Sequence, residues 1–196
     1  MSALVLITPP ATEPLTNAEA MVHLRVDSQI EIPYIDNLIK AARVTAERIT
    51  RRALITQTWE LYLDTFPAWE IGVPKPTLQS IISIVYTDTD GILQTLPGSM
   101  YLVDEKSEPG RITPAFGEVW PVTRAQTNAV IVRFVAGYGD ADDVPAGIKH
   151  WMQMRMRQLY DNRSATVIGT SVDDIPRSFV DGLLDDFVAL DYGWAT

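Results

Sequence analysis

The strongest constraint on the fold is one amphipathic stretch, residues 32–52, which reads IPYIDNLIKAARVTAERITRR. Its apolar residues recur at steps of three and four, so they fall on one stripe of an α-helix. They are Ile32, Ile35, Leu38, Ile39, Ala42, Ala46 and Ile49. Pro33 suits the first turn of a helix, where a missing N–H costs little. The pattern predicts a long helix, and the small Ala42 and Ala46 would let a second helix approach its apolar stripe closely.

Charge and composition narrow the classes of protein that the chain can be. It has 196 residues, enough for one domain with a substantial core, and a net charge of −9, which argues against wrapping nucleic acid by phosphate neutralisation. It has no cysteine, and its two histidines are too few for a histidine-rich metal site. No apolar run approaches the ~18 residues of a membrane helix, and the first ten residues are too weakly charged for a signal peptide. We therefore expect a soluble protein made in a cytoplasm, without cofactor, metal or membrane partner.

The remaining elements follow from changes in hydrophobic period. Thr16 and Glu19 fit a capping box at the start of a short helix over residues 16–25. Residues 1–15 contain three prolines and should be extended. A β insertion spans about 56–136, with strands expected at 56–63, 81–86, 92–96, 101–103, 110–113 and 129–135. A second substantial helix is expected over 146–161, with an apolar stripe of Ile148, Trp151, Met152, Met156 and Leu159.

This order predicts an α+β fold, because strands and helices are grouped rather than alternating. A helical scaffold, the long helix 32–52 packed with helix 146–161, carries the inserted β-rich segment and a C-terminal helix. We expect residues 1–171 to form a single domain and residues 172–196 to form a C-terminal helical segment on a flexible connection. That last helix is expected from about Ile175 to Leu190, and its helically spaced apolar residues include Phe179, Leu183, Leu184 and Phe187.

Two acidic motifs could carry chemistry, and each also has a simpler interpretation. Asp88, Asp90 and Gly91 faintly resemble a calcium loop, but the further carboxylates of such a loop are absent, which favours a hairpin turn. Asp104 and Glu105, with Glu108 nearby, could act as a carboxylate pair in general acid–base hydrolysis. Adjacent carboxylates are also common in solvated loops. We expect no enzymatic turnover and keep a hydrolase using Asp104 or Glu105 as the alternative.

The aromatic residues and the histidine of the first helix leave further alternatives open. A small-ligand binding module could be built on stacking tryptophans, although packing in a core or a subunit interface is their commoner use. The five tryptophans are Trp59, Trp69, Trp120, Trp151 and Trp194. His23 has no partner nearby in the sequence, so we expect it to have a structural role.

One short segment carries an excess of positive charge. Residues 57–145 carry five basic and twelve acidic side chains, whereas residues 146–163 carry four basic and one acidic. The four basic residues are Lys149, Arg155, Arg157 and Arg163. Because copies with a net charge of −9 repel one another, this strip could orient a contact with the acidic middle segment of a neighbouring copy. A solvated helix face is the alternative.

Several short motifs follow one another along residues 16–163. The long helix carries Tyr34-Ile35-x-x-Leu38-Ile39-x-Ala41-Ala42 and Glu47-x-x-Thr50-x-Arg52, and it passes into Leu54-Ile55-Thr56-Gln57-Thr58-Trp59. After it come Leu78-Gln79-Ser80-Ile81, the hairpin Tyr86-x-Asp88-x-Asp90-Gly91, Ala136-Gly137-Tyr138-Gly139, Val144-Pro145 and Leu159-Tyr160-x-Asn162-Arg163. This ordered set resembles the head–tail connector (adaptor) proteins of long-tailed bacteriophages and prophages, especially the larger branch with a β insertion.

The resemblance implies a structural role without catalytic residues. Such proteins form a ring, usually of about a dozen subunits, under the portal, which joins the capsid to the next neck or tail protein and continues the DNA channel. Assembly in the bacterial host cytoplasm, a final place in the virion neck, and DNA that passes without specific binding are implied too. An acidic chain suits that channel, because it repels phosphates. The candidate assembly contacts are then Lys149, Arg155, Arg157, Arg163, Phe179, Leu183, Leu184 and Phe187.

Overall fold

A computed structural model describes residues 2–162 and 182–189 of the chain. The described residues fall into two compact units. The β unit is built from segments within Met1–Pro10 and Thr56–Tyr138, and the helical unit from Ala11–Ile55 and Gly139–Val188. The chain therefore enters the β unit at its N-terminal end, leaves it for the first helices, and returns to it at Thr56.

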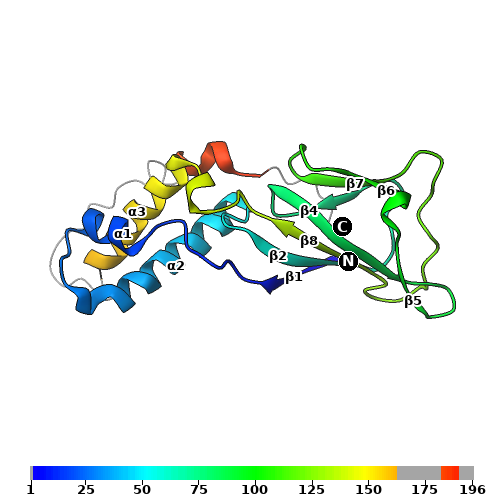
Figure 1. The fold of residues 1–196 in the computed structure, drawn as a ribbon, viewed down its shortest axis with the longest axis horizontal. Helices are drawn as coiled ribbons and strands as arrows, with labels where there is room; N and C mark the ends of the chain where they lie inside the picture. Colours follow the sequence, from blue (N-terminus) through cyan, green and yellow to red (C-terminus); the bar gives the residue numbers. More distant parts are fainter. Residues whose placement is uncertain (1, 163–181, 190–196) are drawn as a thin grey trace. The chain divides into compact units, whose positions relative to one another are not determined.

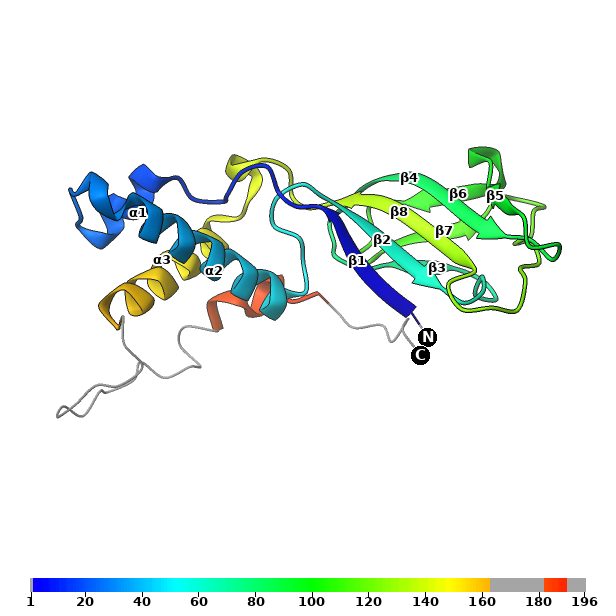
Figure 2. The ribbon, with the colours of Figure 1, turned by 90° about the horizontal axis from the view of Figure 1, so that it is seen from below.

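The β unit contains two antiparallel sheets in the described part of the chain (Figures 1 and 2). The five-stranded sheet has the order β1 (Ser2–Thr8), β2 (Gln57–Leu63), β8 (Val130–Ala136), β4 (Leu78–Thr87) and β5 (Leu93–Thr95). The three-stranded sheet has the order β3 (Ile71–Val73), β7 (Gly110–Pro114) and β6 (Tyr101–Asp104). A 3₁₀ turn, η2 (Gly98–Met100), leads into β6. The predicted β insertion is therefore confirmed as a sheet-forming segment.

Buried and more exposed side chains alternate along the central strand β8, which identifies the covered face of the five-stranded sheet. Val130, Val132, Phe134 and Ala136 are buried, and the residues between them are more exposed, as expected for a strand with one covered face. Gly110 of the three-stranded sheet lies against Leu78 of β4, because a Cβ at Gly110 would come within 2.6 Å of that side chain. The absent side chain therefore lets the two sheets approach each other closely at this point.

Two strands are absent from the sequence-based prediction. Residues 2–8 are extended as expected, but they also form β1, which pairs with β2 from Ser2 opposite Leu63 to Thr8 opposite Thr58. β3 occupies only three residues in a stretch that the neighbouring prolines mark as a loop. Its pairing with β7 is long-range, and a three-residue run carries too little periodicity to reveal it.

The helical unit begins with the predicted capping box. α1 (Asn17–Leu24) has Thr16 as its N-cap: the N–H of Glu19 donates to Oγ1 of Thr16 at 3.2 Å, and the N–H of Thr16 donates to Oε2 of Glu19 at 2.7 Å. α2 (Ile32–Thr50) and α3 (Ala146–Asp161) are the predicted long helices. Short 3₁₀ helices complete the unit: η1 (Gln29–Glu31), η3 (Ala141–Asp143) and η4 (Gly182–Phe187).

α2 packs directly against α3, which confirms the predicted helical scaffold (Figure 1). Ala42 and Ala46 of α2 are completely buried, and Ile39 is 1% exposed. On α3 the buried residues include Trp151 and Met152. The helix ends two residues before the predicted Arg52, because Arg51 adopts a left-handed conformation (φ 59°) at the C-cap. No helix in the described residues has the length and apolarity needed to cross a membrane.

The buried stripe of α2 yields the first prediction. Ile39→Ala should lower the free energy of unfolding by about 2–5 kcal/mol, because it removes buried methyl groups and leaves a cavity. The matched control is Val44→Ala on the same helix, where the Val44 side chain is 55% exposed and a change within about 0.5 kcal/mol is expected. Urea unfolding measures both. Equal losses in the two variants would contradict the burial of Ile39.

Candidate assembly surfaces

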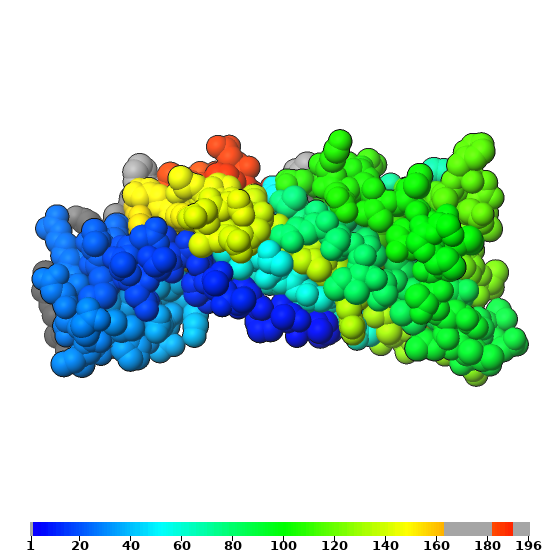
Figure 3. Space-filling model, in the orientation of Figure 1, coloured from blue at the N-terminus to red at the C-terminus, as the bar shows by residue number. Residues whose placement is uncertain are grey.

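The described C-terminal segment is packed on the helical unit. η4 contacts α3 and α2, and Figure 3 shows its red atoms beside the yellow atoms of α3. Leu184 is completely buried. The ring of Phe187 lies against Gly147 of α3, since a Cβ there would come within 3.0 Å of Cε2 of Phe187. The guanidinium Nε of buried Arg52 donates a 2.6 Å hydrogen bond to the carbonyl of Phe187.

These contacts refine the prediction for the C-terminal helix. Within the described residues the predicted α-helix is a 3₁₀ helix over Gly182–Phe187, and its ending fits the bond from Arg52 to the carbonyl of Phe187. Among the predicted contact residues, Leu184 belongs to the core, whereas Leu183 and Phe187 remain half-buried. Phe179 and the beginning of the predicted helix lie outside the described residues.

The burial of Leu184 yields a second prediction. Leu184→Ala should lower the free energy of unfolding by about 2–5 kcal/mol, because the side chain fills space between η4 and the long helices. Val188→Ala is the control, since Val188 follows the same turn and is 39% exposed. Chemical denaturation compares the two variants with the unmodified chain. A Leu184 variant as stable as the Val188 variant would mean that η4 is not part of the core in solution.

The basic residues of α3 differ in the partners that their side chains already have within this chain. Arg157 donates from Nε to Oδ2 of Asp161 at 2.7 Å and from Nη1 to the carbonyl of Leu24 at 3.1 Å, so it ties α3 to the end of α1. Arg155 donates from Nη1 to the neutral Gln158 side chain at 2.6 Å. Lys149 is half-buried and helps to lower the pKa of Glu19, after the larger effect of the Thr16 hydrogen bonds. Arg163 lies outside the described residues.

His23 lies beside this basic face. Burial lowers the pKa of its imidazole, and the nearby charges of His150 and Arg157 lower it further. At neutral pH the ring is therefore uncharged, and it adds no positive charge to the face.

Asp104 is a structural acceptor in the turn between β6 and β7. Its Oδ1 accepts from the N–H groups of Lys106 and Ser107, both at 3.1 Å. Its Oδ2 accepts from Oγ of Ser107 at 2.6 Å and from Nη2 of Arg111 at 2.8 Å. The bond from Ser107 and the Arg111 guanidinium hold the pKa of Asp104 well below its usual range. A carboxyl with so low a pKa is a poor general acid at neutral pH, so Asp104 does not fit that role in the hydrolase alternative.

The Asp104 turn yields a prediction about pH. The folded pKa of Asp104 is depressed, so its ionised form stabilises the fold above the unfolded pKa of about 3.9, and this stabilisation declines as the pH falls below that value. Asp104→Asn should therefore lower the urea midpoint at neutral pH, and the difference from the unmodified chain should shrink below about pH 4. Glu105→Gln is the control in the same turn. A pH-independent difference would contradict the proposed ion pairing.

The other acidic motif forms the predicted hairpin turn. Oδ1 of Asp88 accepts from the N–H groups of Asp90 and Ile92, at 3.0 and 2.9 Å, and Oδ2 accepts from Nε2 of Gln94 at 2.9 Å. These bonds lower the pKa of Asp88, with the Gln94 bond as the largest cause. In the described residues no group of three or more His, Asp or Glu side chains could hold a metal ion.

The tryptophans occupy separate places rather than one stacking site. Trp151 is 1% exposed in the helical unit. Trp120 stacks on Phe66 with ring centroids 4.9 Å apart and donates from Nε1 to the carbonyl of Trp69 at 3.0 Å. Trp59 has the Lys75 ammonium 5.3 Å from its ring centroid. Trp194 lies outside the described residues. The described tryptophans are therefore used in core packing, ring stacking and hydrogen bonding within the protein.

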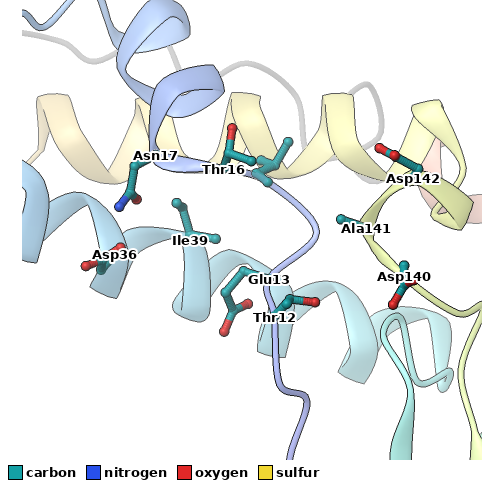
Figure 4. A pocket seen from close by; sticks show the side chains of 10 residues that line it. Thr12, Glu13, Thr16, Asn17, Asp36, Ile39, Asp140, Ala141 and Asp142 are labelled. Carbon is teal, nitrogen blue, oxygen red and sulfur yellow. The ribbon is translucent and has the colours of Figure 1, made fainter.

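A hollow of about 600 Å³ lies in the helical unit (Figure 4). Its acidic lining comes from three segments: Glu13 before α1, Asp36 of α2, and Asp140 and Asp142 around η3. Glu13 is neutralised by Arg43, whose Nε lies 2.7 Å from Oε2 of the carboxylate, and Arg43 also pairs with Glu47 at 2.9 Å. The second of these ion pairs joins residues four positions apart on one face of α2. The hollow is open, and four of its ten lining residues are acidic.

One surface was missed by the sequence-based analysis. The loop between β7 and β8 exposes three large apolar residues: Phe116 at 103%, Val119 at 77% and Val122 at 75%. The loop is held in place by Trp120 and by the N–H of Arg124, which donates to the carbonyl of Thr87 at 3.0 Å. The sequence predicts a connection here, between the strands at 110–113 and 129–135, but not the exposure of its apolar residues, because that depends on where the folded chain places the loop.

Three solved structures with the same fold come from one kind of particle. A chain from the neck of an empty gene transfer agent (GTA) particle, computed with C6 symmetry, has a TM-score of 0.77 and 20% identity over 96% of each chain. A chain from the virion of the native GTA particle has a TM-score of 0.74 and 18% identity over 96% of each chain. A chain from the native GTA neck, computed with C12 symmetry, gives 0.71 and 20% over 97% of this chain and 96% of the other.

The protein has the fold of these GTA chains. The match spans both units, since it covers nearly the whole chain, and it agrees with the connector resemblance drawn from the motifs. No protein-family model matches the sequence, and no curated protein matches it either. At 18–20% identity, the likeness to these solved structures lies in the fold.

Proposed function

We propose that the protein is a structural subunit of a phage or phage-like neck, forming a ring under the portal that joins the capsid to the tail. The observation that carries the proposal is the fold shared over 96% of both chains with a GTA neck protein at a TM-score of 0.77. Similarity confined to one unit would be compatible with a common module reused elsewhere. Similarity over both units and their connections supports the same kind of building block.

A cyclic ring would be the assembly formed by this subunit. GTA necks with the same fold are described with C6 and C12 symmetry. In such a ring each copy presents one surface to the copy on one side and a different surface to the copy on the other. The net charge of −9 would oppose close packing, so the contacts must be uncharged or must pair basic with acidic groups. The same charge would let DNA pass through the ring without being held.

Among the predicted contact residues, Arg155 is the best supported for a role between copies. Its guanidinium donates to a neutral glutamine, whereas Arg157 is ion-paired with Asp161 inside its own helix. A contact between Arg155 and the acidic β unit of a neighbour would offset repulsion and orient the two copies. Arg163, Phe179, Leu183 and Phe187 remain proposed contacts, with the portal or the neighbouring copy as partner. Lys149 and Arg157 are proposed to stabilise the helical unit itself. Arg157 bonds to Asp161 and to the carbonyl of Leu24, and Lys149 lies near the Glu19 carboxylate.

The exposed loop between β7 and β8 is proposed to contact the next neck or tail protein. Phe116 is fully exposed on a loop anchored by Trp120, which keeps the entropic cost of ordering it on binding small. Aromatic anchors of this kind often dominate binding energy at protein interfaces. The protein is proposed to act without enzymatic turnover, assembling in the host cytoplasm and remaining in the virion neck.

Negative-stain microscopy of the protein mixed with its cognate portal tests this function. The unmodified chain should form rings stacked coaxially on the portal. Arg155→Glu should weaken ring formation at low salt, with a smaller effect at high salt where charge contacts are screened. Lys40→Glu, on the exposed face of α2, is the charge-matched control and should form rings normally. Failure of the unmodified chain to bind the portal would overturn the neck assignment, and normal rings from the Arg155 variant would remove only that contact.

A further inference from the structure

The five-stranded sheet of the β unit ends in two unlike open edges. On one side β1 pairs only with β2, and no strand in the described residues covers its outer side. On the other side β5 pairs with β4 only at Val85–Thr87, and the last bond runs from the N–H of Leu96 to the carbonyl of Ile84 at 2.8 Å. Residues 79–83 of β4 therefore have no strand on that side within the described part of the chain.

Both open edges lack the features that normally protect an edge strand. Natural edges are usually blocked by charged side chains, prolines or a covering segment. β1 reads SALVLIT and β4 reads LQSIISIVYT, so neither contains a proline or a charged residue. Val5, Leu6 and Ile7 are 41–43% exposed, and Ile82 is 53% exposed. Figure 3 shows the dark-blue atoms of β1 at the molecular surface.

β4 also has two irregularities in its pairing with β8, between Leu78 and Ser80 and between Ile81 and Ser83. Such bulges can weaken an edge by twisting it. The same side of β4 nevertheless accepts β5 a few residues further along, so the strand is able to pair there. β5 ends at Thr95 and Pro97 follows the last bond, which leaves the preceding part of β4 uncovered among the described residues.

We propose that the outer edge of β1 in one copy pairs with residues 79–83 of β4 in the next copy. This inference rests on the proposed ring. A cyclic contact joins two different surfaces, and the two ends of one sheet supply such a pair, whereas β1 pairing with itself would close a two-fold dimer. Backbone hydrogen bonds between uncharged strands also avoid the repulsion expected between copies of net charge −9.

The dimensions are compatible with a closed belt. From β1 to β4 each copy contributes four strands in the order β1, β2, β8 and β4. At a strand spacing of about 4.8 Å, four strands cover about 19 Å, and twelve copies would give a belt of about 230 Å in circumference. The sheet would then run continuously around the ring, with each copy supplying one edge to each neighbour.

The test uses two lysine variants that each block one edge. Val5→Lys should remove the β1 contact and Ile82→Lys the β4 contact, so neither variant alone should form rings on the portal. An equimolar mixture should form heterodimers in solution, because each variant keeps the edge that the other lacks, and analytical ultracentrifugation would detect them. Val44→Lys on α2 is the matched control and should form rings. Circular dichroism checks that every variant is folded.

Cysteine pairs provide a second measurement that does not depend on blocking assembly. The chain has no cysteine, so Val5→Cys with Ile82→Cys introduces the only thiols. Oxidation of rings of the double variant should give a ladder of disulfide-linked oligomers, and each single variant should give none. Three outcomes would overturn the edge contact and leave the proposed function intact. They are rings formed by either lysine variant, disulfide-linked dimers of the Val5→Cys variant alone, and rings of the double variant that give no ladder. Absence of rings from the unmodified chain would overturn both.

Discussion

The close contact between α2 and α3 is the interaction on which the helical unit depends. On α2, Ala42 and Ala46 are completely buried and present almost no side-chain bulk, so neighbouring elements can pack closely on this face of the helix. α1 and η4 then pack on this pair. The surfaces of the unit follow from the same contact, because burying the apolar stripe of α3 leaves Arg155 and Arg157 on its outer side.

The sequence predicted most of this unit because its signals are local. The apolar stripe of α2, the capping box at Thr16 and the stripe of α3 each lie within a few turns of one helix, and all three occur as predicted. The C-terminal helix was predicted less accurately. Its apolar spacing fits an α-helix, but in the described residues the backbone forms a 3₁₀ turn whose end is bonded to Arg52, a residue more than a hundred positions away.

The β unit and the candidate surfaces were predicted less completely, because they too depend on residues that are distant in the sequence. The hairpin at Asp88 and the strands around it carry their own turn and period signals, whereas β1 and β3 become strands only by pairing with distant partners. The exposed Phe116 could not be told from a buried one, since exposure is a property of the folded chain. The role of Asp104 likewise depends on Ser107 and on Arg111 across a hairpin, which lower the pKa of a plausible catalytic acid and make it a hydrogen-bond acceptor in the turn.

The strand order of the five-stranded sheet has a consequence for how the chain folds. β8 lies between β2 and β4, although it follows both of them in the sequence, and β1 joins β2 across the whole first helical segment. No central pair of this sheet can form until the ribosome has released residue 136. The helices α1 and α2 precede that point and form from local contacts, so the β unit sets the pace of folding, as expected for pairings of large sequence separation. Until β8 arrives, β2 and β4 each lack the strand that lies between them in the finished sheet, and early encounters between copies at these strands would lead to aggregation.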